Sequence, residues 1–431
     1  MNNLKLWMAA AGVILLSTRL FAQTTHQDSL RQVMRQVQIL TEELEKSKLQ
    51  EVARRKYESV SGLGPAASQV YHLKKAGVSL AGYGEAIYEN YASRREDGMP
   101  VNKLDRIDFL RNVVYLGFKF NERFLFNAEI EYEHSKVGEG APGEVAMEFG
   151  YLDAWLSPNL SLRAGMILVP MGIINEAHEP PTFLTTLRPE TERLIIPATW
   201  RSIGIGLVGR TPSGFGYRLY LLEGLNARKF TASGIRKGRQ NGAEAVAEDF
   251  ALSGRLDYTG LNGLTFGGSF YWGNSGQGMT DVNQAEIAAS TALFSLHGRY
   301  ATRGLELRAM AVWSFIGDVE RLNQALGLTG QNSIGKRQYG FYFNLAYNVL
   351  QHASWAGRAT LKPFLQYEKL NTQASVPGGF AQNPANDRST LTIGLVYKPI
   401  QNIAFKIDYL NRNTAANTGA NQFNAGVSYL F

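Results

Sequence analysis

The sequence predicts an all-β fold, a 16-stranded antiparallel transmembrane β-barrel with a short N-terminal α-helix or coiled-coil segment. Strand-length segments from residue 77 onward alternate apolar and polar residues, and the connections between them alternate short and long. Glycine (44 residues), Tyr (20) and Phe (22) are frequent, whereas only 19% of residues are charged. The mean hydropathy of −0.18 is too polar for a helical membrane protein, but it suits strands in which every second side chain faces lipid.

Residues 1–22 are expected to be a signal peptide. Lys5 gives a positive start, residues 6–16 are apolar over the length of a signal h-region, and Ala22 offers a small residue for cleavage. A transmembrane anchor is disfavoured because the apolar run is too short and Arg19 closes it. The sequence therefore predicts export to the bacterial outer membrane.

Composition excludes several classes of site. The chain contains no Cys, which excludes a lipoprotein anchor, a disulfide framework and a thiolate metal site. Removing Lys5 and Arg19 with the signal peptide lowers the formal net charge from +7 to +5. This mild excess comes without any recognition motif, so no nucleic-acid partner is expected.

Residues 23–60 are predicted to form a periplasmic helix or coiled coil, and residues 61–76 a linker. Leu30, Val33, Val37, Leu40 and Leu44 recur at spacings of three and four, the a/d seam of a heptad pattern. The seam fades after about two heptads, so self-association and a solvated helix under the barrel both remain open. Gly and Pro residues between 59 and 68 mark the linker.

Residues 77–431 are predicted to form the barrel. In 423–431, for example, Phe423, Ala425, Val427, Tyr429 and Phe431 share one strand face. The sixteen expected strands begin near residues 78, 106, 123, 145, 160, 202, 215, 250, 264, 292, 304, 338, 360, 389, 402 and 422. An even number is the rule for single-chain bacterial barrels.

The connections support the same architecture. Short ones include 121–122, 157–159, 211–214, 260–263, 302–303 and 399–401. Long ones include 92–104, 170–200, 226–249, 274–290, 318–337, 371–388 and 411–421. Short turns at one end and long loops at the other are typical of outer-membrane barrels, whereas a soluble sandwich has no reason to sort loops in this way. The terminal Phe431 is expected to be recognised by the barrel-assembly machinery.

Residues 163–172 read Arg-Ala-Gly-Met-Ile-Leu-Val-Pro-Met-Gly, and after a long loop residues 203–209 read Ile-Gly-Ile-Gly-Leu-Val-Gly. With weaker echoes at 253–258, 361–368 and 391–399, the chain resembles the phosphate-selective porin O and P family and related Bacteroidetes-type outer-membrane porins. The resemblance covers about residues 78–431. It implies sixteen strands, a homotrimer, and a third loop, here residues 170–200, that folds inward and narrows the pore.

The strand faces assigned to the lumen carry both signs of charge. The candidate lumen-facing charges are Arg111, Lys119, Glu129, Glu131, Arg163, Arg255, Arg299, Arg308, Lys362, Lys406 and Asp408. The candidate constriction residues in and beside the loop are Glu176, His178, Glu179, Arg188, Glu190, Arg193 and Arg201. A mixed lumen disfavours a simple anion ladder, and for each of these arginines a structural salt bridge competes with a role in solute contact.

The predicted function is passive diffusion of small polar solutes or ions, with an anion or phosphate preference as a finer hypothesis. The alternative is a structural or adhesive outer-membrane barrel tethered or trimerised by the N-terminal helix. We expect no metal, because the Glu176–Glu179 stretch lacks a second ligand cluster, and no cofactor. The six His residues are scattered, which disfavours an enzyme. Expected partners are outer-membrane lipid, polar or anionic solutes, and two further copies of the chain.

Overall fold

The computed structural model describes residue 32, residues 34–43 and residues 58–431. The chain divides into two units, residues 1–57 and residues 58–431. In the first unit residues 34–43 are helical, and Met34, Val37 and Leu40 are exposed. The expected signal peptide and three of the seam residues, Leu30, Val33 and Leu44, lie outside the described residues. None of the described helices is long and apolar enough to cross a membrane.

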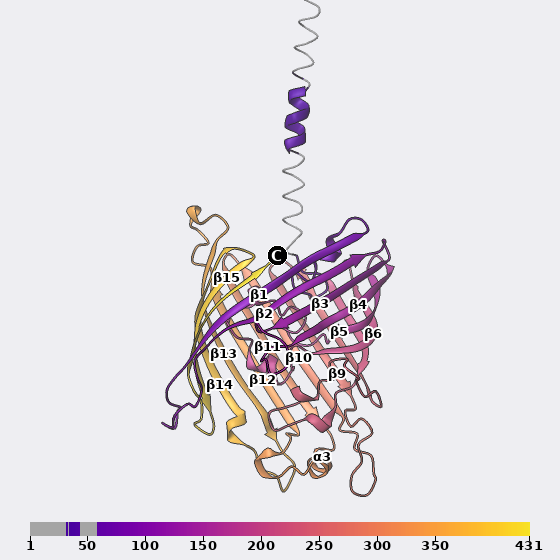
Figure 1. Cartoon of the computed structure of the whole chain (residues 1–431), viewed down its shortest axis with the longest axis vertical. Helices are drawn as coiled ribbons and strands as arrows, with labels where there is room; N and C mark the ends of the chain where they lie inside the picture. The colour runs from indigo at the N-terminus through magenta and orange to yellow at the C-terminus, as the bar shows by residue number, and fades with distance from the viewer. Residues whose placement is uncertain (1–31, 33, 44–57) are drawn as a thin grey trace, which may run out of the picture. The chain divides into compact units, whose positions relative to one another are not determined.

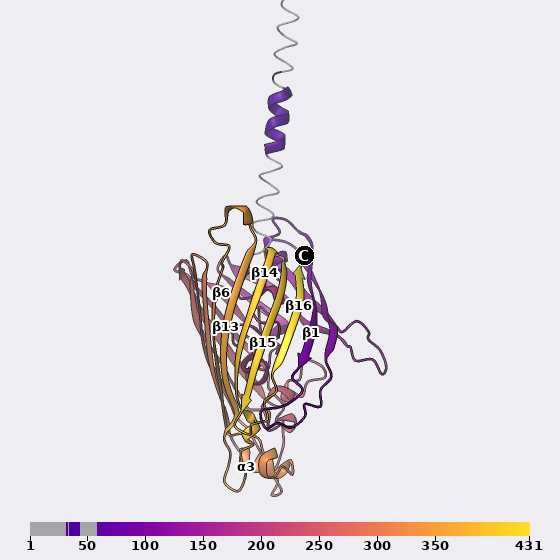
Figure 2. The same cartoon turned by 90° about the vertical axis from the view of Figure 1, so that its left-hand side faces the viewer.

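The second unit is a closed antiparallel barrel of sixteen strands, each paired with its sequence neighbour, with β1 and β16 closing the ring (Figures 1 and 2). The predicted fold class is confirmed. The strands are β1 Gly77–Tyr91, β2 Arg106–Lys119, β3 Phe124–Glu133, β4 Val145–Ser157, β5 Leu160–Leu168, β6 Arg201–Arg210, β7 Phe215–Glu223, β8 Phe250–Leu261, β9 Leu264–Gly273, β10 Thr291–Thr302, β11 Leu305–Ile316, β12 Arg337–Tyr347, β13 Thr360–Ser375, β14 Asp387–Ile400, β15 Ile403–Thr414 and β16 Gln422–Leu430.

Short helices occupy the connections and the barrel interior. They are η1 Gln69–His72, η2 Pro180–Thr182, α2 Glu190–Leu194, η3 Ala227–Lys229, η4 Arg236–Gly238, α3 Val319–Ala325, η5 Gly330–Asn332, η6 Ser354–Ala356 and η7 Pro384–Asn386. The long connections gather at one end of the barrel, the end at which Figure 1 shows α3; we call it the long-loop end. The chain terminus at Phe431 lies at the opposite, short-turn end (Figure 1).

Alternation of side chains explains why these segments form wall strands. In β12, Phe341, Phe343 and Leu345 are exposed on the outer face, whereas Tyr342 and Ala346 are buried on the inner face. Successive strand residues point to opposite faces, so one face meets lipid and the other meets the interior. The same alternation let the strand starts be predicted to within two residues.

The seam between β1 and β16 is packed on its outer face by the C-terminal aromatic residues. A Cβ added at Gly82 would lie 2.5 Å from the Phe431 ring, and one at Gly84 would lie 2.4 Å from the Tyr429 ring. Both glycines therefore leave room for a ring that lies across the neighbouring strand, the arrangement by which aromatics compensate for strand glycines.

The segment predicted as a linker packs inside the short-turn end of the barrel. Leu63, Ala66, Ala67 and Val70 are almost fully buried. The first three belong to the same apolar cluster as inner-face residues such as Tyr115. The Gly and Pro residues that suggested a connector instead form a compact turn ahead of η1. Burial of this kind has no signature in local composition, because it depends on inner-face partners that are distant in the sequence.

Candidate functional site

The connection between β5 and β6, residues 169–200, runs through the barrel interior, and we call it the inward loop. Its two ends are joined by the carboxylate of Glu192 in α2, which is fully buried. Glu192 accepts hydrogen bonds from the backbone N–H groups of Ile173 and Ile174, both at 3.0 Å, and from the Tyr342 hydroxyl of β12 at 2.7 Å. Charged acceptors with several donors make strong, oriented contacts, so this residue fixes the loop to the wall.

A second anchor attaches the loop to β15. The Lys406 ammonium donates to the carbonyl oxygens of Pro180 (2.7 Å) and Thr185 (2.9 Å) and lies 4.1 Å from the centre of the Phe183 ring. Beside it the Asp408 carboxylate accepts the backbone N–H of Thr186. These two predicted lumen charges therefore hold the loop backbone.

Apolar packing reinforces this second anchor. Leu184 is buried against inner-face residues of β12 to β15, namely Ala346, Phe364, Val396 and Ala404. In a ring of sixteen strands, β13 and β14 lie about opposite β5 and β6. The inward loop thus crosses the lumen from one wall to the other.

The third anchor is Glu368 of β13, whose carboxylate accepts the backbone N–H groups of Glu190 (3.1 Å) and Thr191. These are unpaired donors of the first turn of α2, and a carboxylate is the usual partner for such donors. Glu368 therefore sets the position of Glu190 in the lumen.

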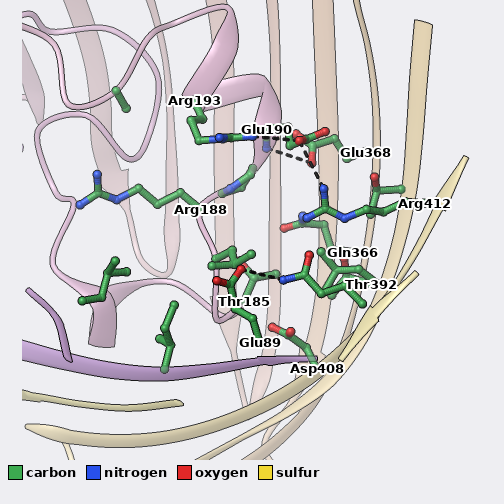
Figure 3. Close-up of a pocket in the computed structure, with 18 of the residues that line it drawn as sticks. Glu89, Thr185, Arg188, Glu190, Arg193, Gln366, Glu368, Thr392, Asp408 and Arg412 are labelled. Carbon is green, nitrogen blue, oxygen red and sulfur yellow. Dashed lines mark hydrogen bonds and ion pairs between the residues drawn. The ribbon is translucent and has the colours of Figure 1, made fainter. Parts of the chain in front are cut away.

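Four of the seven predicted constriction residues are buried in contacts with the wall or with the segment before β1. Glu176 pairs with Arg218 (2.9 Å), His178 lies 2.9 Å from Glu129, and Arg201 pairs with Glu148. Glu179 accepts the N–H groups of Ala66 and Ala67. The remaining three, Arg188, Glu190 and Arg193, line a cavity of about 350 Å³ at the long-loop side of the loop (Figure 3).

The cavity wall carries charges of both signs in nearly equal number. Its basic side chains are Lys103, Arg111, Arg188, Arg193, Arg236 and Arg412, and its acidic ones are Glu89, Glu133, Glu190, Glu368 and Asp408. A second cavity of about 440 Å³ shares Lys103, Glu190 and Arg412 with it and adds Arg95 and Arg388.

Three guanidinium groups surround the single carboxylate of Glu190, as Figure 3 shows for two of them. Glu190 Oε1 lies 3.0 Å from Arg193, 3.4 Å from Arg412 and 3.5 Å from Arg388. Burial alone would raise the pKa of Glu190, but Arg412, Arg388 and Arg193 hold it below its usual value. The carboxyl group is therefore ionised at neutral pH, and the cluster of three guanidinium groups and one carboxylate carries an excess of two positive charges.

The other predicted lumen charges lie in separate groups. At the short-turn end Arg299, Arg308 and Lys362 surround Glu306 at 3.4, 2.5 and 2.8 Å. Arg163 is buried in an ion pair with Asp153 at 2.7 Å.

The rest of these charges make contacts with neighbouring wall residues or with other parts of the chain. Arg111 pairs with Glu85 and Glu131. Arg255 pairs with Asp257 and donates to the Gly172 carbonyl oxygen, and Lys119 donates to the carbonyl oxygen of Leu73.

Sequence reasoning missed Arg388 and Arg412 because it began one strand too late and ended the next one too early. β15 extends to Thr414, and β14 begins at Asp387, so residues assigned to long loops belong to the wall. The signal was present for Arg412, which continues the inner-face series of Lys406, Asp408 and Leu410 at a spacing of two. Among the described residues, no group of three His, Asp or Glu side chains could hold a metal ion.

Comparison with known proteins gives one close relative and many structural neighbours. No family model matches the chain. A protein of Aquifex aeolicus (strain VF5) described as uncharacterised is 37% identical over 395 residues, which cover 90% of this chain and 87% of that protein.

The structural neighbours are outer-membrane proteins. The loop L8 deletion mutant of OmpT, an outer membrane protein of Vibrio cholerae, has a TM-score of 0.52 at 12% identity over 83% of this chain and 100% of that chain. OmpF of Salmonella typhi in complex with daunomycin has a TM-score of 0.51 at 13% identity over 83% and 98%. The anion-selective porin from Comamonas acidovorans has a TM-score of 0.51 at 11% identity over 83% and 100%. At these identities the likeness shows the fold alone, a porin-like β-barrel.

Proposed function

We propose that this chain, which belongs to the same family as the Aquifex aeolicus protein, is an outer-membrane porin for passive diffusion of small polar solutes and ions. The observation that carries the proposal is the inward loop, which crosses the lumen beside a water-accessible cavity lined by charged groups. A loop that narrows a barrel lumen and leaves charges at the remaining opening selects solutes by size and field. Residues 170–200 are then the pore constriction, and we propose no catalytic role.

We propose a mild anion preference, with phosphate as one candidate anion. It is supported by the excess positive charge around Glu190, from Arg193, Arg388 and Arg412. The five carboxylates of the cavity wall limit the preference, because cations also find partners there. Membership of the phosphate-selective O and P family remains a proposal that rests on the motif at residues 163–172.

The proposed biological setting follows from the same barrel. Exposed apolar and aromatic side chains such as Phe341, Trp313 and Tyr409 suit contact with outer-membrane lipid. We propose export by the signal peptide of residues 1–22, assembly through the C-terminal Phe431, and a homotrimer in which residues 23–60 associate as a coiled coil.

The deciding experiment is the reversal potential of the purified, folded full-length chain in a planar bilayer under a KCl gradient. We expect channel conductance and a reversal potential on the anion side, with added phosphate reducing the chloride current. A folded barrel that passes no current would refute the channel. Conductance without anion preference or phosphate block would leave a general porin and refute the finer proposal.

A structural or adhesive barrel is a second candidate, favoured by how much of the lumen the chain itself fills. The inward loop crosses it, and Leu63 and Val70 are buried at the short-turn end. Deleting residues 23–60 separates the two candidates. If channel activity survives and the oligomer is lost, the N-terminal region assembles a porin; if the folded deletion and the full chain are both silent, the structural role is favoured.

A further inference from the structure

Residues 58–73, which we call the N-terminal segment, pack against the inner face of the barrel wall. Val70 of this segment lies against Gly117 of β2. Val70 is almost fully buried, and a Cβ added at Gly117 would lie 2.5 Å from the Val70 Cβ. A side chain at position 117 would therefore occupy the space that Val70 now fills. The absence of a side chain at Gly117 makes a socket for this residue.

The contact between the N-terminal segment and the inward loop is made by Glu179. This carboxylate is 1% exposed and accepts the backbone N–H groups of Ala66 (3.0 Å) and Ala67 (2.9 Å). A Cβ at Gly64 would lie 2.3 Å from the Glu179 carboxyl carbon, so only glycine permits this approach. Glu179 of the inward loop thus binds the N-terminal segment by two charge-assisted hydrogen bonds.

The far end of the segment covers a buried ion pair of the wall. The Tyr71 hydroxyl donates to Asp153 at 2.7 Å and accepts from the Arg163 guanidinium at 2.9 Å. The side-chain amide of Asn127 donates to the carbonyl oxygen of Ala67 at 2.9 Å. Polar groups that an open lumen would present to solutes are therefore satisfied by the chain's own residues 66–71.

We propose that the N-terminal segment is a plug of the short-turn end, latched to the constriction loop by Glu179, and that its release widens the ion pathway. The inference rests on the proposed channel function. The segment joins no strand ladder of the barrel, so it can leave without breaking the wall. Its departure would uncover Arg163, Asp153 and Glu179 to the lumen.

The test introduces a side chain at Gly117 and compares the effect with the same substitution at another inner-face glycine. Gly117→Val places a side chain where Val70 sits, whereas Gly216→Val adds the same side chain to the inner face of β7, where no atom lies within 4 Å. Glu179→Ala removes the latch and serves as a second variant if Gly117→Val folds poorly. Retained barrel structure is checked by circular dichroism and heat-modifiable mobility on gels.

Two readouts are measured in each variant: single-channel conductance, and labelling of one engineered cysteine. The chain has no Cys, so Ala66→Cys, at a site that is 1% exposed, reports the segment alone. We expect Gly117→Val and Glu179→Ala to raise conductance about two-fold or more. We also expect maleimide labelling at position 66 to accelerate at least about ten-fold, with Gly216→Val unchanged in both readouts.

Three results would overturn the proposal, and they are distinguishable. Fast labelling of position 66 in the otherwise unaltered chain would mean that the segment is not docked. Accelerated labelling with unchanged conductance would mean that the segment is docked but does not narrow the pathway. Absence of current in every chain, the unaltered one included, would instead refute the channel function, and the segment would then be a structural element.

Discussion

The hydrogen bond from Tyr342 to Glu192 offers the sharpest test of how the inward loop is held. Tyr342→Phe removes the hydroxyl that donates to the buried carboxylate at 2.7 Å and leaves Glu192 with only the N–H groups of Ile173 and Ile174. No water reaches this site to replace the donor, since Glu192 is fully buried. A hydrogen bond to a charged group contributes about 1.5–3 kcal/mol, so we expect local opening of the loop to become easier by about 2 kcal/mol.

That free energy corresponds to about 30-fold faster amide exchange at residues 173 and 174 if exchange proceeds by local opening. The measurement is hydrogen exchange by mass spectrometry on the folded barrel in detergent. Tyr339→Phe is the control, because Tyr339 lies on the opposite face of the same strand. Acceleration of less than about three-fold at residues 173 and 174 would refute the view that Glu192 holds the loop through this contact. Faster exchange along all of β12 would mean that the wall, not the loop, had loosened.

Three further predictions concern the cavity, the loop anchor and the barrel seam. Arg412→Gln should lower the anion-to-cation permeability ratio about two-fold in 0.1 M KCl, and less in 1 M KCl because salt screens the field. Reversal potentials in planar bilayers measure this ratio, and Arg94→Gln, at an exposed position, is the control. Leu184→Ala should weaken the anchor on β12 to β15 by about 2–4 kcal/mol and speed proteolysis of the loop, more than the half-buried Leu187→Ala; equal rates would contradict the anchor. Gly84→Val should reduce the yield of folded barrel, because the Tyr429 ring occupies that space, whereas Gly77→Val on the same strand should not, since no atom lies within 4 Å; equal yields would refute the seam argument.

Much of the fold could be predicted because a barrel strand carries its structural rule locally. Every second residue must suit lipid, so Phe341, Phe343 and Leu345 identify β12 without knowledge of any partner strand. Loop lengths then order the strands, since each must pair with its sequence neighbour. The lipid-facing rule no longer applies where a strand extends beyond the membrane. For this reason the end of β15, which carries Arg412, resembles a loop in the sequence.

The site could be predicted only in part, because burial decides which charges remain available to a solute. A buried charge without a partner is too costly, so each charge that the inward loop carries into the barrel needs a partner from the wall or from another segment. Glu176 in the loop pairs with Arg218 of β7, and Arg201, where β6 begins, pairs with Glu148 of β4. Glu179 accepts two backbone N–H groups of the N-terminal segment. Because these charged groups hold the loop in place, they are not available to bind a solute. The sequence alone gives no indication of these pairings.

The charges that remain available to solutes lie in clusters where basic groups outnumber carboxylates. Around Glu190 three guanidinium groups share one carboxylate, so the cluster cannot neutralise itself, and it borders both cavities at the long-loop end. Around Glu306 the same ratio recurs at the short-turn end with Arg299, Arg308 and Lys362. In the channel proposed above, these two cationic clusters would lie on opposite sides of the inward loop, and each would offer an anion a favourable position. Selectivity in such a channel depends on the imbalance within each cluster rather than on the net charge of the chain.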